Sequence, residues 1–119
     1  MRNPLQQFAL NQLAGIQESL VQAQEEADRE LRATKLEGTS GGGLVKAHVN
    51  GAGEIIDVQI DRSVIDPEES ELLQDLVCAA VRDALHKASE MEGEVRREKL
   101  RSSGPLAALA QMGFELPEL

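Results

Sequence analysis

Apolar side chains recur every three or four residues along the N-terminal part of the chain. They form one stripe, with Gln, Glu and Arg on the other sides: Leu13, Ile16, Leu20, Ala23, Ala27 and Leu31. This spacing is typical of an amphipathic α-helix. Asn3 is a suitable N-cap, Pro4 suits the first helical position, and Gln6 can reach back to the cap. The pattern therefore predicts a long helix over 4–33.

After residue 33 the pattern changes to an alternation of apolar and polar positions. One strand is predicted over 44–49 and another over 55–60, with a less regular one over 34–39 anchored by Leu36. The side chains expected on the apolar face are Val45, Ala47, Val49, Ile56, Val58 and Ile60. Those expected on the opposite, polar face are Lys35, Glu37, Lys46, His48, Asp57, Gln59 and Asp61. We therefore expect a sheet with one covered face and one wet face.

Glycines separate the alternating segments, at Gly41-Gly42-Gly43 and at Gly51-Ala52-Gly53. A phosphate-binding loop requires Gly-Lys-Ser/Thr followed by a helix, because the amides and the helix dipole must meet the phosphates. Here both glycine runs lead into strands. We interpret Thr39–Gly43 and Asn50–Gly53 as hairpin turns in which glycine supplies positive φ, with no nucleotide site.

A second long helix is predicted from Asp66-Pro67 to about Leu100, ended by Ser102–Pro105. Its main apolar stripe comprises Leu73, Val77, Ala80, Ala84, Ala88, Met91 and Val95. Beside it lie Leu72 and Leu76 on one edge and Cys78, Val81 and Leu85 on the other. Together they cover more of the circumference than a surface helix of a small monomer needs. A short helix over Leu106–Met112 and a loose tail over 113–119 complete the prediction.

The predicted order of elements is α-β-β-β-α, an α+β fold with a three-stranded antiparallel meander and two long helices. We expect one domain over residues 1–105 and a C-terminal tail over 106–119. Helices of roughly 45–50 Å, at about 1.5 Å per residue, would overhang a domain whose radius of gyration is about 13–14 Å. The apolar residues on the protruding parts of these helices need a partner that buries them, and a second copy of the chain is the simplest one. The predicted homodimer interface comprises Leu72, Leu76, Cys78, Val81 and Leu85.

Composition argues against several functions. The 119 residues carry 12 Lys and Arg against 21 Asp and Glu, a formal net charge of -9, so phosphates could be bound only by local basic clusters. Without Trp or Tyr, aromatic stacking on bases is not expected. His48 and His86 lie on different elements and are interpreted as surface histidines, and the single cysteine, Cys78, as a packed thiol. We expect no enzyme activity, cofactor, metal or small-molecule substrate.

The chain also shows no signal-peptide core and no stretch of 18 apolar residues. The expectation is a soluble cytoplasmic protein without a membrane partner.

Two runs, EGTSGGGLVKAHVNGAGEIIDVQID and DPEESELLQDLVCAAVRDALHKA, closely resemble the YbaB/EbfC family of nucleoid-associated proteins. The resemblance covers about Leu31 to Ala88. It implies an α-β-β-β-α protomer, a tweezer-like homodimer, and non-enzymatic, largely sequence-tolerant binding of duplex DNA in the bacterial nucleoid. Two features differ from many members. The first helix is rich in Gln and Glu instead of Met and Lys, and the second continues into the charged extension EMEGEVRREKLR.

Basic residues gather in two places. The candidates for contacts to the DNA backbone are Arg29, Arg32 and Lys35 in one group, and Arg96, Arg97, Lys99 and Arg101 in the other. Lys and Arg also favour helix C-terminal turns because of the dipole, so clustering alone does not prove phosphate contact. The alternative is a dimeric acidic protein-interaction module that does not bind DNA directly.

Overall fold

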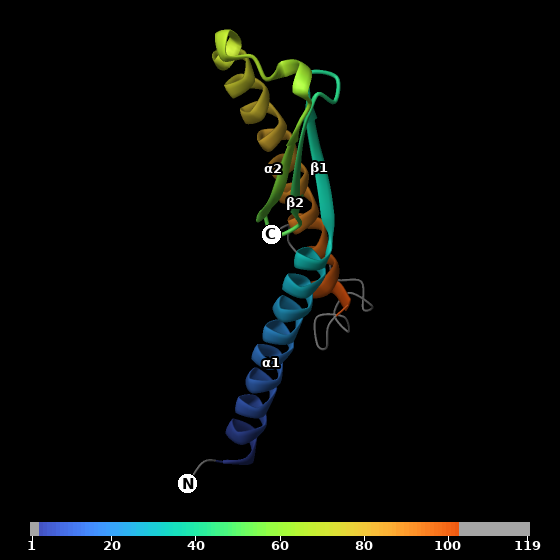
Figure 1. Cartoon of the computed structure of the whole chain (residues 1–119). Coiled ribbons are helices and arrows are strands. Elements are labelled where there is room, and N and C mark those ends of the chain that lie inside the picture. The colour runs from blue at the N-terminus through green and yellow to red at the C-terminus, as the bar shows by residue number, and fades with distance from the viewer. Residues whose placement is uncertain (1–2, 103–119) are drawn as a thin grey trace. The chain divides into compact units, whose positions relative to one another are not determined.

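The computed structural model describes residues 3–102, which fold in the predicted order (Figure 1). The α+β arrangement and the limits of both helices are confirmed to within a few residues. The predicted helix over 106–112 and the tail lie outside the described residues. The elements are α1 (Pro4–Ala33), β1 (Lys35–Ser40), β2 (Val45–Asn50), β3 (Ile55–Ile60), two short 3₁₀ turns (Arg62–Val64 and Pro67–Glu69) and α2 (Ser70–Ser102).

The chain divides into two compact units, and both long helices contribute residues to each. One unit comprises residues 29–93 and contains the whole sheet. The other contains, among the described residues, 3–28 of the N-terminal region and 94–102 of α2. The two units are described separately below.

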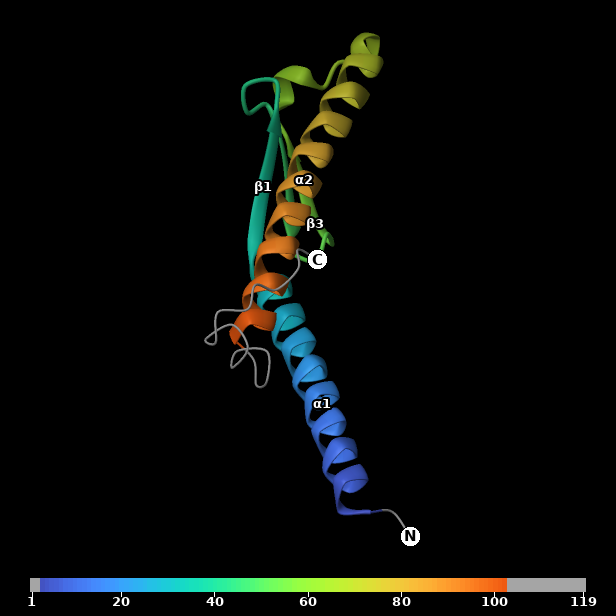
Figure 2. The same cartoon turned by 180° about the vertical axis from the view of Figure 1, so that it is seen from behind.

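The three strands form an antiparallel meander in the order β1-β2-β3. Gly38 pairs with Ala47, and Ala47 pairs with Val58, so these residues form one row across the sheet. α2 lies behind the sheet in Figure 1 and in front of it in Figure 2, where the view is turned by 180°. This helix therefore packs against one face of the sheet.

The core lies between β2 and α2, as the two apolar patterns predict. Its fully buried members are Val45, Ala47 and Val49 from β2 and Ala80, Ala84 and Ala88 from α2. Ala80, Ala84 and Ala88 are four positions apart and lie on one side of α2, and their small side chains let the helix approach the sheet closely. Where β1 passes the helix, at Gly38, there is no room for a side chain. A Cβ on Gly38 would lie 2.2 Å from the backbone nitrogen of Ala84 and 2.3 Å from the carbonyl oxygen of Ala80.

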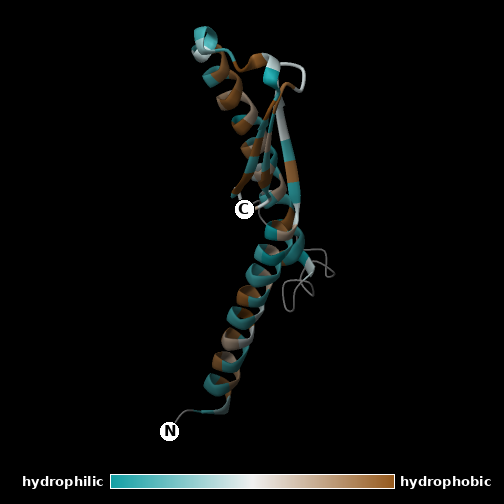
Figure 3. Ribbon diagram, in the orientation of Figure 1, coloured by the Kyte–Doolittle hydropathy of each residue, from teal (hydrophilic) through white to brown (hydrophobic). Residues whose placement is uncertain are grey.

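The expectation that helices cover the whole apolar face of the sheet is wrong for β3. Every residue of β3 is exposed, including Ile56 (52%), Val58 (36%) and Ile60 (36%). Figure 3 shows this strand with brown, hydrophobic segments. The reason is the position of α2: its buried alanines pack with β2 and against Gly38 of β1, and no β3 residue joins that core.

Both glycine-rich segments are turns, as predicted. Gly41, Gly42 and Gly43 have φ angles of 60°, 70° and 94°, and the chain then enters β2 directly. In the second turn, the side-chain oxygen of Asn50 accepts hydrogen bonds from the backbone N–H groups of Ala52 and Glu54, each at 3.0 Å. These turns fix the register of the meander.

In the other unit, Ala23 and Ala27 of α1 are buried, while Leu5, Phe8 and Leu13 nearer the N-terminus are exposed. The predicted apolar stripe of α1 is therefore covered only toward its C-terminal end. Within residues 3–102, neither helix combines the length and apolar content that crossing a membrane requires.

Candidate nucleic-acid interface

The first basic group lies where α1 ends and β1 begins, in the unit of residues 29–93. Arg29, Arg32 and Lys35 are all exposed. Arg32 Nε lies 3.6 Å from Glu54 Oε1, with the two side chains 69% and 63% exposed. An ion pair this open to solvent contributes little to stability. A phosphate could therefore replace Glu54 at small cost.

The second basic group lies in the last turns of α2, in the other unit. Arg96 Nη2 donates a 2.9 Å hydrogen bond to Asp28 Oδ1 of α1, and both side chains are partly buried. Arg97 and Lys99 are half-buried and also have partners, whereas Arg101 is exposed. The two groups therefore differ: the first is open to solvent, and most of the second is already engaged within the chain.

The sequence-based candidates for DNA contact did not include the exposed basic residues Arg82 and His86 on α2. They are four residues apart and so share one side of the helix. His86 pairs with Glu90 at 2.9 Å, which offsets positive charge there. The spacing of four residues was the one sequence feature that relates Arg82 to His86. It is a weak indication of a basic surface because only two residues share it.

The polar face of the sheet carries a row of titratable side chains across all three strands. Glu37, His48 and Asp57 are direct neighbours in the strand register. His48 Nε2 lies 3.0 Å from Glu37 Oε1, and Nδ1 is hydrogen-bonded to Asp57 Oδ1. These two hydrogen bonds, the one to Asp57 foremost, raise the pKa of His48. Carboxylates on both sides of the imidazole make this face a poor surface for phosphate.

The interpretation of His48 as a surface histidine is wrong, because only 7% of the residue is exposed. It lies on the outward face but is covered by its carboxylate neighbours. His86, in contrast, is exposed as expected. Among residues 3–102, no group of three His, Cys, Asp or Glu side chains could hold a metal ion.

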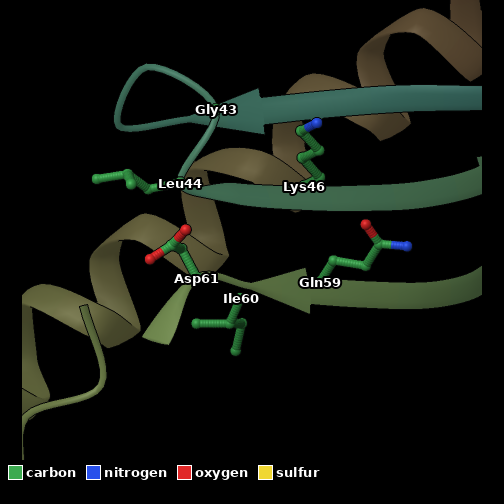
Figure 4. A pocket seen from close by; sticks show the side chains of 6 residues that line it. All are labelled: Gly43, Leu44, Lys46, Gln59, Ile60 and Asp61. Atoms are coloured by element: carbon green, nitrogen blue, oxygen red, sulfur yellow. The ribbon is translucent and has the colours of Figure 1, made fainter. Parts of the chain in front are cut away.

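A shallow pocket of about 230 Å³ lies beside the three-glycine turn. Lys46 and Gln59 project from neighbouring strands, with Asp61 at the end of β3 (Figure 4). The backbone N–H of Ser63 donates to the Asp61 carboxylate and lowers its pKa, so the carboxylate is ionised at neutral pH. An anion here would meet that negative charge, which argues against a phosphate cradle.

The residues predicted for the dimer interface have two different environments. Leu76 and Val81 are partly buried against the core of their own chain. Leu72 and Leu85 are exposed, at 50% and 37%. Cys78 is exposed as well, so its thiol is not packed by residues of its own chain.

Comparisons with known proteins add an independent line of evidence. Residues 3–100 match the family model of the YbaB/EbfC DNA-binding family. A nucleoid-associated protein of Nocardia farcinica is 40% identical over 106 residues, which cover 89% of this chain and 90% of that protein. One of Rhodococcus erythropolis is 44% identical over 110 residues, covering 92% and 87%. The crystal structure of the uncharacterized protein HP0035 from Helicobacter pylori aligns with a TM-score of 0.68 at 28% identity, covering 76% of this chain and 95% of that one.

Proposed function

This chain belongs to the YbaB/EbfC DNA-binding family, and we propose that it binds duplex DNA as a homodimer through contacts to the DNA backbone. The resemblance predicted from residues 31–88 is confirmed, and the match extends over residues 3–100. The family is one of DNA-binding, nucleoid-associated proteins. The name of the bacterial relatives supports a place in the cytoplasmic nucleoid and a role in binding without catalysis.

The observation that carries the proposed binding mode is the solvent-exposed group of Arg29, Arg32 and Lys35 on a chain whose net charge is -9. An acidic protein approaches DNA only through a surface where positive charge is locally separated from carboxylates. Arg32 of this group pairs with a carboxylate, that of Glu54, at a distance and with an exposure that leave the ion pair weak. Contacts to phosphates position a protein without reading sequence, which fits sequence-tolerant binding.

The second basic group takes a smaller part in this proposal. Arg101 is exposed and free to approach a phosphate geometrically, while Arg97 and Lys99 are half-buried. For Arg96 we propose a structural role, because its guanidinium already holds Asp28. Binding through Arg97 and Lys99 would require their present partners to be exchanged for phosphate.

The homodimer is supported by the uncovered part of the sheet. Val58 and Ile60 are more than a third exposed although they pair with the buried Ala47 and Val45, and Ile55, which pairs with the buried Val49, is 57% exposed. A contiguous apolar surface of this kind marks an interaction site, and a second copy is the simplest partner. Dimerisation also presents each basic group twice to one duplex.

Binding of labelled duplexes at several salt concentrations tests the proposal. Three phosphate contacts from each of two chains give a log–log slope of about -5, because each neutralised phosphate adds about 0.9. Duplexes of unrelated sequence should give similar affinities, measured by fluorescence anisotropy. Absence of binding to every duplex at low salt would overturn the proposal and favour the protein-interaction alternative.

A further inference from the structure

The turn that follows β2 contains an asparagine directly before a glycine, Asn50-Gly51. In an unfolded chain such a pair deamidates readily, because glycine has no side chain to hinder its backbone nitrogen. That nitrogen loses its proton to water and attacks Asn50 Cγ. The bond between Cγ and Nδ2 breaks, and Nδ2 takes up a proton and leaves as ammonia. Water then opens the cyclic imide to aspartate or isoaspartate.

The fold makes use of both residues of this reactive pair. Asn50 Oδ1 accepts the backbone N–H groups of Ala52 and Glu54, and Asn50 Nδ2 donates to Glu54 Oε1 at 2.9 Å. A Cβ on Gly51 would lie 2.9 Å from both the carbonyl oxygen and Cδ2 of Leu31. The turn therefore needs a side-chain amide at position 50 and has no room for a side chain at position 51.

The hydrogen bonds of the Asn50 side chain do not protect its amide from attack. During the attack, negative charge develops on Oδ1, where the two backbone N–H groups at 3.0 Å would stabilise it. On its own, this arrangement would favour cyclisation. Protection of the folded chain must therefore come from the nucleophile, the nitrogen of Gly51.

That nitrogen is held by the end of α1. Its N–H donates to the carbonyl oxygen of Leu31 at 2.7 Å and to that of Thr34 at 3.1 Å. Hydrogen bonds that favour the neutral form of a group disfavour its ionisation, and a deprotonated nitrogen here would face two carbonyl oxygens. The Leu31 side chain is fully buried, which anchors the last turn of α1 beside Gly51.

We propose that Asn50 is a deamidation site that the end of α1 keeps unreactive. Cyclisation requires the Gly51 N–H to be released from Leu31, so it takes place in chains that have opened at this point and marks them covalently. An isoaspartate adds a methylene group to the main chain after residue 50, which disturbs the pairing of this residue with Lys35 and the contact of Gly51 with α1. An aspartate loses the Nδ2 donor and brings a second carboxylate to Glu54. Both products oppose a return to the native turn.

The rate of deamidation in folded and unfolded protein tests the protection. The full chain is kept at mildly alkaline pH, in buffer or in guanidinium chloride, and mass spectrometry follows the peptide that contains Asn50. The reaction should be at least about tenfold slower in buffer, because it needs an opening of the structure. Equal rates in the two solutions would overturn the proposal.

Two controls belong to this experiment. Gly51→Ala should slow the reaction in guanidinium chloride, where the lack of space in the folded turn has no effect, because the new methyl group hinders the attack. Asn3 and Asn11 serve as internal references. Asn3 precedes a proline, which has no N–H to lose, and Asn11 precedes the larger Gln12, so neither should react at a comparable rate.

A matched pair of variants tests the part assigned to α1. Leu31→Ala loosens the end of α1 and leaves Asn50-Gly51 unchanged, whereas Leu76→Ala shortens a leucine that packs against the core from α2. Rates in buffer are corrected for the unfolded fraction, which guanidinium unfolding gives. The corrected rate should rise for Leu31→Ala alone. Equal corrected rates for the two variants would overturn the assignment to α1.

The parent protein gives the same test without a substitution that could prevent folding. At guanidinium concentrations below the unfolding transition, the deamidation rate should change little, because a local opening exposes little surface. A rate that rises in parallel with global unfolding would overturn the assignment. Deamidated chains carry an extra negative charge and are separated by ion exchange. After refolding they should unfold at a lower guanidinium concentration than untreated protein, and equal midpoints would refute the proposed consequence of the modification.

Discussion

His48 on β2 lies directly across the ladder from Asp57 on β3 and is hydrogen-bonded to it through Nδ1. Glu37 holds the other ring nitrogen, so the imidazole lies between two carboxylates. Both hydrogen bonds favour the protonated ring and raise the pKa of His48, an effect that burial and the charge of Lys35 oppose. The folded protein therefore binds this proton more tightly than the unfolded chain does.

From this we predict that stability falls as the pH rises above the unfolded-state pKa of histidine, about 6.5. A raised folded-state pKa gives a contribution that is fully present below the unfolded value of about 6.5 and is lost as pH rises through the folded value. Urea unfolding followed from below pH 6 upward should show this loss. His48→Gln should remove it, and His86→Gln, the matched change at an exposed histidine, should retain it. Identical pH profiles for the parent and His48→Gln would contradict the prediction.

Gly38→Ala should destabilise the protein severely. The new Cβ would lie 2.2 Å from a backbone atom of α2, and two backbone segments cannot yield as a flexible side chain can. Overpacking of a core typically costs 1–3 kcal/mol, and we expect a loss of more than about 3 kcal/mol here. Thermal or urea unfolding measures it.

Gly15→Ala is the control for that change. Gly15 lies within α1, and a Cβ there would meet nothing within 4 Å. Alanine in place of glycine inside a helix should stabilise by about 0.5–1 kcal/mol. Equal effects of the two substitutions would show that the close contact of β1 with α2 does not determine stability.

For DNA binding, we predict that Arg29→Gln combined with Lys35→Gln weakens affinity for every duplex alike. The log–log salt slope should lose about 1.8 for each chain that contacts the duplex. Arg62→Gln combined with Arg82→Gln removes the same charge from exposed positions outside the proposed group. If that control flattened the slope equally, net charge and not the surface at the end of α1 would govern binding.

We also predict that the three-glycine turn binds no nucleotide. It leads into a strand, and Asp61 faces the neighbouring pocket. Calorimetry with ATP, GTP and NAD should show no heat of binding. Micromolar binding that Lys46→Ala abolishes would refute this interpretation.

The periodicity of the sequence was sufficient to predict the secondary structure. A 3–4 spacing of apolar residues up to Leu31 and an alternation over 44–60 are local consequences of helix and strand geometry. The glycine turns were equally predictable, because a positive φ such as that of Gly42 is a local property of the backbone. The family could be recognised from residues at turns and in the core.

What surrounds each side chain was decided by tertiary packing. Alternation placed His48 on the polar face, but only the strand register brought Glu37 and Asp57 to its two sides and buried it. From their clustering in the sequence, all seven basic residues were equal candidates for phosphate contact. The structure shows that Arg96 is hydrogen-bonded to Asp28 of α1, which is far away in the sequence.

For the strands, too, the sequence pattern did not predict which side chains are buried. The alternating pattern predicted the same inward direction for Val45 and Ile60, yet α2 buries the first and leaves the second exposed. A pattern of hydrophobicity states which way a side chain points. Only the arrangement of elements distant in the chain determines what meets it there.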